Sequence, residues 1–234
     1  MARFKNTLQA KRERAEEVFK RLRKAYPDAR CTLNYKTPLD LLVATILAAQ
    51  CTDDRVNVVT RTLFKKYRRP QDYVNASRAE FEEDIRTCGF FRQKAKCIVN
   101  ACSRIIDTYG GAVPTTMEDL VTLDGVGRKT ANVILSECFG TPGIIVDTHC
   151  IRVSRRLGFT RQEDPGKIEQ DLMKIWPRED WTLNSHRIVF HGRAVCRARA
   201  PLCAECPVNT MCPYYAAQEN ASEIQGVDSP LDNL

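Results

Sequence analysis

Long hydrophobic runs are missing from this chain of 234 residues. Its longest largely apolar stretch covers residues 41–49, whereas a helix needs about 20 apolar residues to cross a bilayer. The basic N-terminal region also lacks an apolar signal core before Ala15, so secretion is not expected. These absences exclude a membrane protein and favour the cytoplasm.

Alternating strand patterns are also scarce. The only short β-like run is 143–147, and five residues cannot form a sheet. Helical spacing fills most of the rest, with N-cap residues at expected starts: Thr37 before Pro38, Ser77 with Glu80, and Asp164 before Pro165. The sequence therefore predicts an all-α protein of short helices, the first over residues 8–26.

Acidic residues are too few to balance the basic ones, which leaves a net charge of +7. The last 22 residues contain four acids and no Lys or Arg. The remainder of the chain therefore carries +11. Such an excess is typical of a protein with a polyanionic partner.

Cysteine, by contrast, is abundant, with 11 residues. A reducing compartment and an odd number both disfavour a disulfide framework. Seven of the cysteines are scattered through helical patterns, where small buried hydrophobes are expected. The other four lie at 196, 203, 206 and 212, and this local cluster indicates a metal site.

The spacing of those four is Cys196-x6-Cys203-x2-Cys206-x5-Cys212. A compact loop of four thiolates can hold a four-iron cluster, with one thiolate on each iron. A zinc site of four cysteines is the competing interpretation, although such sites usually show two short Cys pairs and this segment has one. Basic residues surround the segment without any acid from 185 to 203: Arg187, His191, Arg193, Arg197 and Arg199. They form either a basic patch or an ordinary solvated face.

A second motif is Leu123-Asp-Gly-Val-Gly-Arg-Lys-Thr-Ala131, which predicts a helix over 117–123, a turn, and a second helix from Arg128. Gly125 and Gly127 allow backbone N–H groups to approach a phosphate, and the following helix N-terminus favours an anion. Such contacts position DNA without reading its sequence. The alternative is a plain helix-turn-helix corner. The spacing does not fit a nucleotide P-loop.

Two further residues are candidates for covalent chemistry. Lys129 starts the helix after the hairpin, where Arg128 and the helix dipole both disfavour the charged amine. A neutral amine can act as a nucleophile and form a Schiff base. Asp147 precedes the helical segment 148–157. Simpler roles are a phosphate contact for Lys129 and an N-cap for Asp147.

These motifs together resemble the endonuclease III family of DNA glycosylases. The resemblance rests on the hairpin through Asn132, on Val146-Asp-Thr-His149, on His191-Gly-Arg193 and on the four cysteines, and it spans residues 37–212. It implies a six-helix barrel with the helix-hairpin-helix at 31–141 and a discontinuous iron–sulfur domain from 1–30 and 142–215, flanking a DNA-binding cleft. Residues 216–234 are expected to be a flexible tail.

The resemblance also implies an activity. Lys129 would attack C1′ of a damaged nucleotide, and Asp147 would stabilise the developing sugar cation. The Schiff base then permits β-elimination, so base release and abasic-site (AP) lyase activity occur together on oxidised or saturated pyrimidines. One [4Fe-4S] cluster on Cys196, Cys203, Cys206 and Cys212 is implied, as is a monomer that binds damaged double-stranded DNA at the nucleoid.

The expected DNA contacts follow from the same family. They are the hairpin residues Gly125, Gly127, Arg128 and Thr130, the inserted residues Gln50 and Phe90, and His149 and Arg193. A core position is the alternative for Phe90. The chain departs from the family at Asp124, where proline is frequent, and at Ala48, Cys51 and Cys150.

Two other functions compete with this prediction. An adenine-mismatch glycosylase shares the hairpin, the Asp and the cluster, but it uses a Glu on the early helix and lacks the Lys. Here Thr45 occupies the position of that Glu, and Lys129 is present. A non-catalytic DNA-binding protein would use only the hairpin and the cluster.

Overall fold

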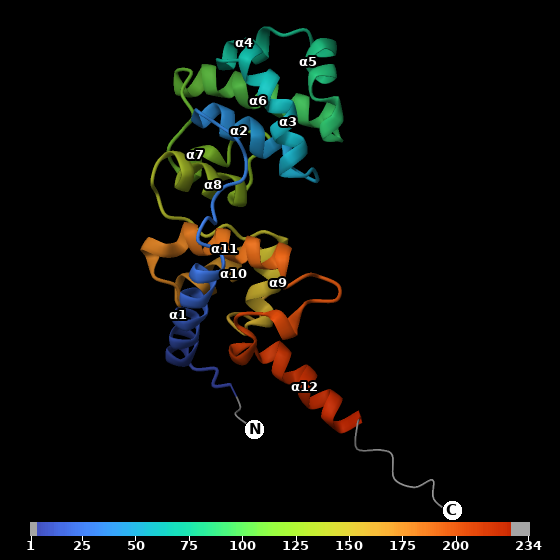
Figure 1. Cartoon of the computed structure of the whole chain (residues 1–234). Helices are drawn as coiled ribbons and strands as arrows, with labels where there is room; N and C mark the ends of the chain where they lie inside the picture. The colour runs from blue at the N-terminus through green and yellow to red at the C-terminus, as the bar shows by residue number, and fades with distance from the viewer. Residues whose placement is uncertain (1–3, 226–234) are drawn as a thin grey trace, which may run out of the picture. The chain divides into compact units, whose positions relative to one another are not determined.

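The computed structural model describes residues 4–225, with side chains through residue 219. Within these residues all regular structure is helical and no strand occurs, so the all-α prediction is confirmed (Figure 1). None of the described helices is long and apolar enough to cross a membrane. The chain divides into two compact units, one formed by Cys31–Gly143 and the other by the residues up to Arg30 together with those from Ile144 onward.

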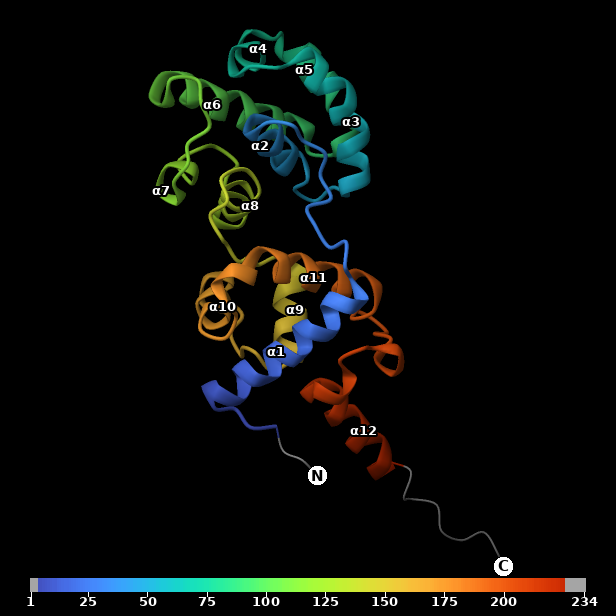
Figure 2. The same cartoon turned by 60° about the vertical axis from the view of Figure 1, so that its left-hand side comes forward.

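The continuous unit contains seven α-helices and one 3-10 turn among the described residues. They are α2 (Pro38–Leu47), α3 (Asp53–Lys66), α4 (Pro70–Asn75), α5 (Arg78–Asp84), η1 (Arg86–Cys88), α6 (Phe91–Tyr109), α7 (Met117–Leu120) and α8 (Arg128–Cys138). Every residue of α2 from Leu39 to Leu47 is buried. Helices α3, α6 and α8 pack around it, as both views show (Figures 1 and 2). A helix covered on all sides explains why its sequence is almost wholly apolar.

The discontinuous unit joins the N-terminal helix to the last part of the chain. Its elements are α1 (Leu8–Ala25), α9 (Thr148–Arg156), α10 (Pro165–Met173), η2 (Arg178–Asp180), α11 (Trp181–Ala194), η3 (Cys203–Glu205), η4 (Asn209–Met211) and α12 (Pro213–Gln225). Phe19 of α1 packs edge-on against Trp176, with ring centroids 4.9 Å apart. The α1 face formed by Val18, Phe19 and Leu22 thus belongs to the same core as α9 and α10.

Most of the predicted helix starts are confirmed. Thr37 closes a full capping box with Asp40, and Pro38 opens α2. Asp164 caps α10 by accepting a hydrogen bond from the backbone N–H of Lys167. The predicted capping box at Ser77 is wrong, because the Ser77 side chain makes no cap hydrogen bond.

The carboxylate expected to complete that box is engaged elsewhere. Glu80 pairs with Lys66 across a Glu Oε1–Lys Nζ distance of 2.7 Å.

Two boundaries differ from the sequence-based expectation. The helix expected over 117–123 ends at Leu120. Helix α12 continues through Gln225, so the segment expected as a flexible tail from 216 begins inside a helix. The rest of that segment, 226–234, lies outside the described residues. The β-like run is not a strand, and the backbone N–H of Ile145 donates instead to Ser185 Oγ at 3.0 Å.

Candidate functional site

The hairpin turn joins α7 to α8 and is held down by two buried side chains, Leu123 and Val126. Gly125 has φ +79°, and a Cβ there would stand 3.1 Å from Cys97 Cβ. Both the left-handed backbone and the close packing therefore require glycine at 125. Gly127 differs, because its φ is −93° and a Cβ would meet nothing within 4 Å.

Helix α8 begins at an exposed, uncapped terminus. Its N-cap residue is Gly127, and no side chain caps the helix. Arg128 and Lys129 are exposed and Thr130 is half-buried. An N-terminus of this kind presents N–H groups and the positive end of the helix dipole, an arrangement that suits an anion.

Asp124, the departure in the turn, is exposed and accepts a hydrogen bond from Asn100 Nδ2 at 2.7 Å. The carboxylate is thereby attached to α6. This contact gives the turn a side-chain anchor that a proline could not supply.

Gln50 and Phe90 share an unusual backbone. Gln50 has φ +53° and Phe90 has φ +45°, and within the described part of the continuous unit no other non-glycine residue has a positive φ. Left-handed backbone costs a non-glycine residue about 1–3 kcal/mol and is concentrated at functional sites. Phe90 is also 68% exposed, so the core alternative for this ring is wrong.

Sequence reasoning missed Lys94, which is 5% exposed on α6. Its Nζ donates to Leu47 O at 2.8 Å and to Cys88 O at 2.6 Å. Burial lowers the pKa of Lys94. The signal was present, because Lys94 and Ala95 stand at the start of the buried stripe that continues at Ile98.

Lys94 thus connects the segment that leads into Gln50 to the segment that leads into Phe90.

In the discontinuous unit, Asp147 is the N-cap of α9. Its Oδ1 accepts a hydrogen bond from the backbone N–H of Cys150 at 2.7 Å. The capping prediction is confirmed, while the side chain remains partly accessible.

His149 lies in the first turn of the same helix. Its Nδ1 is 3.0 Å from Arg152 Nη2, and burial lowers its pKa. Gly192 explains the close approach of α9 and α11, because a Cβ there would stand 2.9 Å from His149 Nδ1. The neighbouring Arg193 is exposed.

The four clustered cysteines line one cavity, together with residues of α9 and α11. Arg156 Nη1 donates to Cys196 Sγ at 3.3 Å, and Cys206 Sγ lies 3.6 Å from His191 Nε2. Among the described residues, no group of three or more His, Cys, Asp or Glu is arranged to hold a single metal ion. The thiols surround a shared space without closing on one point in it.

The predicted basic patch is smaller than the sequence indicated. Arg187 is buried and donates to Asn184 Oδ1 at 2.8 Å. His191 is also buried, and burial lowers its pKa to about 4, so it is neutral. Only Arg193, Arg197 and Arg199 of the five basic residues are exposed.

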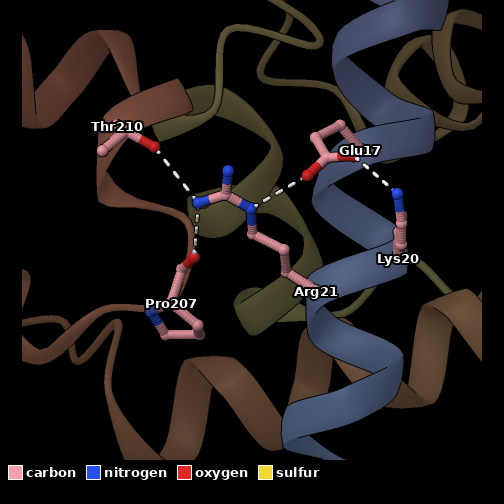
Figure 3. A network of polar contacts seen from close by, with 5 residues as sticks. All are labelled: Glu17, Lys20, Arg21, Pro207 and Thr210. Carbon is pink, nitrogen blue, oxygen red and sulfur yellow. Dashed lines mark hydrogen bonds and ion pairs between the residues drawn. The ribbon is translucent and has the colours of Figure 1, made fainter.

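Helix α1 holds the cysteine-bearing segment through Arg21 (Figure 3). Arg21 Nη1 donates to Pro207 O at 3.3 Å and to Thr210 Oγ1 at 3.2 Å. Its Nε pairs with Glu17 Oε1 at 3.1 Å. The N-terminal helix thereby supports the loop between Cys206 and Cys212.

Thr45 of α2, at the position of the Glu that an adenine-mismatch glycosylase uses, has a hydroxyl group and no carboxylate. It is 7% exposed, and its Oγ1 donates to Leu42 O at 2.8 Å. A buried hydroxyl bonded to its own helix cannot replace the Glu that an adenine-mismatch enzyme needs.

Comparisons with known proteins show which family this chain belongs to. Residues 43–178 match the family described as HhH-GPD superfamily base excision DNA repair protein. Endonuclease III from Synechocystis sp. is 51% identical over 218 residues, which cover 93% of this chain and 100% of that protein. A solved non-covalent endonuclease III–DNA complex and a trapped endonuclease III–DNA covalent intermediate (estranged-adenine complex) each match with a TM-score of 0.85 and 44% identity, over 89% of this chain and 98% of theirs.

The match over more than half of the chain defines the class, a helix-hairpin-helix protein of base excision DNA repair. Within that class, the identity and coverage of its relatives are decisive: the chain belongs to the endonuclease III family.

Proposed function

We propose that this protein is a bifunctional DNA glycosylase and AP lyase that removes oxidised or saturated pyrimidines. The observation that carries the proposal is the exposed Lys129 at the uncapped start of α8, directly after the Gly-Val-Gly turn. The turn and the helix terminus supply N–H groups for a DNA phosphate, and the lysine supplies an amine beside them.

The reaction assigned to Lys129 is covalent. The Nζ lone pair forms a bond to C1′ of the nucleotide while the bond from C1′ to the base breaks and the base leaves. Opening of the sugar gives an iminium between Nζ and C1′. Loss of a proton from C2′ then expels the 3′ phosphate and cleaves the strand. One of the matched structures holds a trapped covalent intermediate of its own protein with DNA.

Asp147 is assigned the electrostatic part of base release. One carboxylate oxygen is engaged by the Cys150 N–H, which fixes the orientation of the group. Its negative charge is suited to stabilise the positive charge that develops on the sugar as the base leaves.

The proposed partner is double-stranded DNA with a damaged base or an abasic site. Extruding a nucleotide costs a few kcal/mol of stacking and pairing. Gln50 and the exposed Phe90 ring are proposed to fill the space left in the stack. Gly125, Gly127, Arg128, Thr130, His149 and Arg193 are proposed to hold the surrounding strand.

The proposed cofactor is one [4Fe-4S] cluster on Cys196, Cys203, Cys206 and Cys212. The donor set fits, because four thiols line one cavity. Arg156 and His191 supply contacts to Cys196 and Cys206, of the kind that tunes thiolate ligands. When bound, the cluster would cross-link the segment from 196 to 212 through its four cysteines.

The cofactor is tested on the protein purified without oxygen. Broad visible absorbance and about four irons per chain are expected. A colourless protein with one zinc per chain contradicts the assignment.

The activity is tested by reduction with borohydride on duplex DNA that contains an abasic site. The wild-type protein is expected to give a covalent complex, and Lys129→Ala is expected to give none while it still binds the duplex. Lys96→Ala is the matched control, because it removes an exposed lysine from α6. A trapped complex formed by Lys129→Ala at the wild-type rate would show that another amine is the nucleophile.

A further inference from the structure

Lys94 holds two separate segments of the chain with one nitrogen atom. Its Nζ donates to Leu47 O at 2.8 Å and to Cys88 O at 2.6 Å. Leu47 is the last residue of α2, and Cys88 is the last residue of η1. Carbonyls at the end of a helix lack partners within that helix, so the side chain of Lys94 completes the hydrogen bonding at both ends.

Each of these two carbonyls lies shortly before a residue with left-handed backbone. Gln50 follows Leu47 by three residues, and Phe90 follows Cys88 by two. Consecutive Cα atoms are about 3.8 Å apart, so neither residue can move far from its fixed carbonyl. Lys94 also holds Phe90 from its other side, because the Lys94 backbone N–H donates to Phe90 O at 3.1 Å.

The two segments need a support of this kind. Left-handed backbone at a non-glycine residue persists only where its surroundings hold it in place. Two carbonyl oxygens that point to one place repel each other unless a donor lies between them. Hydrogen bonds from a charged donor are about twice as strong as neutral ones, and the negative end of the α2 dipole favours a cation beside Leu47.

The environment of Lys94 keeps this bridge intact. Lys94 is 5% exposed, so water competes little for its two hydrogen bonds. Burial lowers the pKa of Lys94. The bridge does not depend on full protonation, because a neutral amine still has two N–H groups, one for each carbonyl.

We propose that Lys94 is a positioning residue, which sets the separation between Gln50 and Phe90 so that both side chains enter the same gap in the DNA stack. This role rests on the proposed function, in which the two side chains fill the space left by one extruded nucleotide. The two residues belong to different loops, so the local chain does not fix their separation. One nitrogen atom bonded to both segments fixes it instead. The buried side chain of Lys94 acts through these residues and needs no contact with DNA.

The mechanical part is tested without DNA, on the full-length protein with its cofactor. Lys94→Met keeps the length of the side chain and removes both hydrogen bonds. Exchange of the Cys51 and Cys88 backbone amides with solvent should become faster together, by roughly tenfold or more. These amides report on the two segments, because they donate to Ala48 O at 3.1 Å and to Ile85 O at 3.0 Å. Unchanged exchange at both amides overturns the proposal.

Three further variants accompany this measurement. Ile105→Val is the control for lost packing, because Ile105 is fully buried in the same helix, about three turns from Lys94. It should not speed exchange at the two amides more than in the rest of the unit. Lys94→Arg keeps the charge and the donors, so it should lie closer to wild type than Lys94→Met. Lys94→Gln, whose side chain is too short to reach both carbonyls, replaces Lys94→Met should the methionine prevent folding.

The consequence for DNA is tested by single-turnover base release from a paired lesion. Lys94→Met should be slower than wild type by roughly tenfold or more, since about 1 Å of misplacement can cost two orders of magnitude. The loss should be smaller on a lesion in a poorly stacked context, which costs less to extrude.

A double-mutant cycle shows whether Lys94 acts through the two inserted residues. If it does, Lys94→Met should slow the Gln50→Ala/Phe90→Ala double variant by less than about twofold. Losses that multiply independently would mean that Lys94 affects folding alone, and they would overturn the positioning role.

The two proposals fail in different ways. If the wild-type protein is inactive on lesion DNA, the proposed function fails, and amide exchange still decides whether Lys94 holds the two segments. If exchange rises at both amides but Lys94→Met releases bases at the wild-type rate, the positioning role is overturned and the proposed function stands.

Discussion

Two aspartates of this protein are helix caps, and a chemical role is proposed for only one of them, Asp147. Asp147 caps α9 through Oδ1, and Asp164 caps α10 in the same way, with Oδ1 accepting from the Lys167 N–H at 2.9 Å. The sequence predicts both as helix caps, because each Asp directly precedes a helical segment. Capping alone does not distinguish them, so the difference has to be measured in catalysis.

Asp147→Asn is predicted to separate capping from catalysis. Asn caps a helix about as well as Asp, so the free energy of unfolding should change by less than about 1 kcal/mol. Lesion DNA should bind at least as tightly, because the negative charge is lost. Base release should slow by roughly 100-fold or more, as expected when charge stabilisation in the transition state is removed. Single-turnover assays measure this rate, and Asp164→Asn is the matched control. Equal effects of the two variants on base release would mean that Asp147 acts only as a helix cap.

Phe90 is predicted to matter for DNA and not for folding. Its ring is 68% exposed, so Phe90→Gly should not lower the midpoint of urea unfolding. The midpoint should rise, because glycine accepts φ +45° without strain. Activity should fall more on a paired lesion than on one in a poorly stacked context. Val58→Ala, which shortens another exposed apolar side chain of this unit, should leave both assays unchanged. A large loss of stability in Phe90→Gly contradicts this assignment.

At the scale of elements, the hairpin depends on two glycines for different reasons. Gly125 needs its left-handed φ and lies against Cys97 and Ile46, whereas Gly127 has ordinary backbone and open space around its Cα. The sequence pattern treats the two alike, as positions where a Cβ would obstruct a phosphate. Only the structure separates the folding requirement at 125 from the proposed binding requirement at 127.

The two Gly→Ala variants are therefore predicted to behave differently. Gly125→Ala should lower the free energy of unfolding by about 1–3 kcal/mol, the cost of left-handed backbone for a residue with a Cβ. Gly127→Ala should cost less than about 1 kcal/mol, as for a weaker N-cap, and should reduce DNA affinity instead. Urea unfolding and duplex binding of both variants check this. The opposite ranking in stability would contradict the geometry of the turn.

The residues at which helices begin were predicted correctly where the capping interaction is local in the sequence. Thr37, Asp147 and Asp164 act within three residues of their own position, and each caps its helix. Ser77 failed because its expected partner Glu80 pairs with Lys66, which is 14 residues away. The contact of Lys94 with the Leu47 carbonyl was missed for the same reason, since the two residues are 47 positions apart and are brought together only by folding.

At the scale of the whole molecule, the positive net charge predicts a polyanionic partner. The structure shows which of the basic side chains are exposed and can contact that partner. Arg187 and His191 are buried, so the face near the cysteines offers Arg193, Arg197 and Arg199. A net charge counts every lysine and arginine equally, whereas only those whose side chains reach a phosphate release counterions from DNA. The net charge of +7 therefore does not give the number of phosphates that the protein neutralises.

DNA affinity is predicted to fall steeply with salt, with a slope of about −0.9 in log K against log salt for each phosphate neutralised by a side chain. Arg193→Ala should make the slope shallower by about one such unit and weaken binding equally for damaged and undamaged duplexes, since a phosphate contact carries no base information. Arg78→Ala is the control, because it removes the same charge from α5, where no DNA contact is proposed. Titrations at several salt concentrations give the slopes. A wild-type slope near zero would mean that the basic excess serves solubility and that binding relies on backbone N–H groups alone.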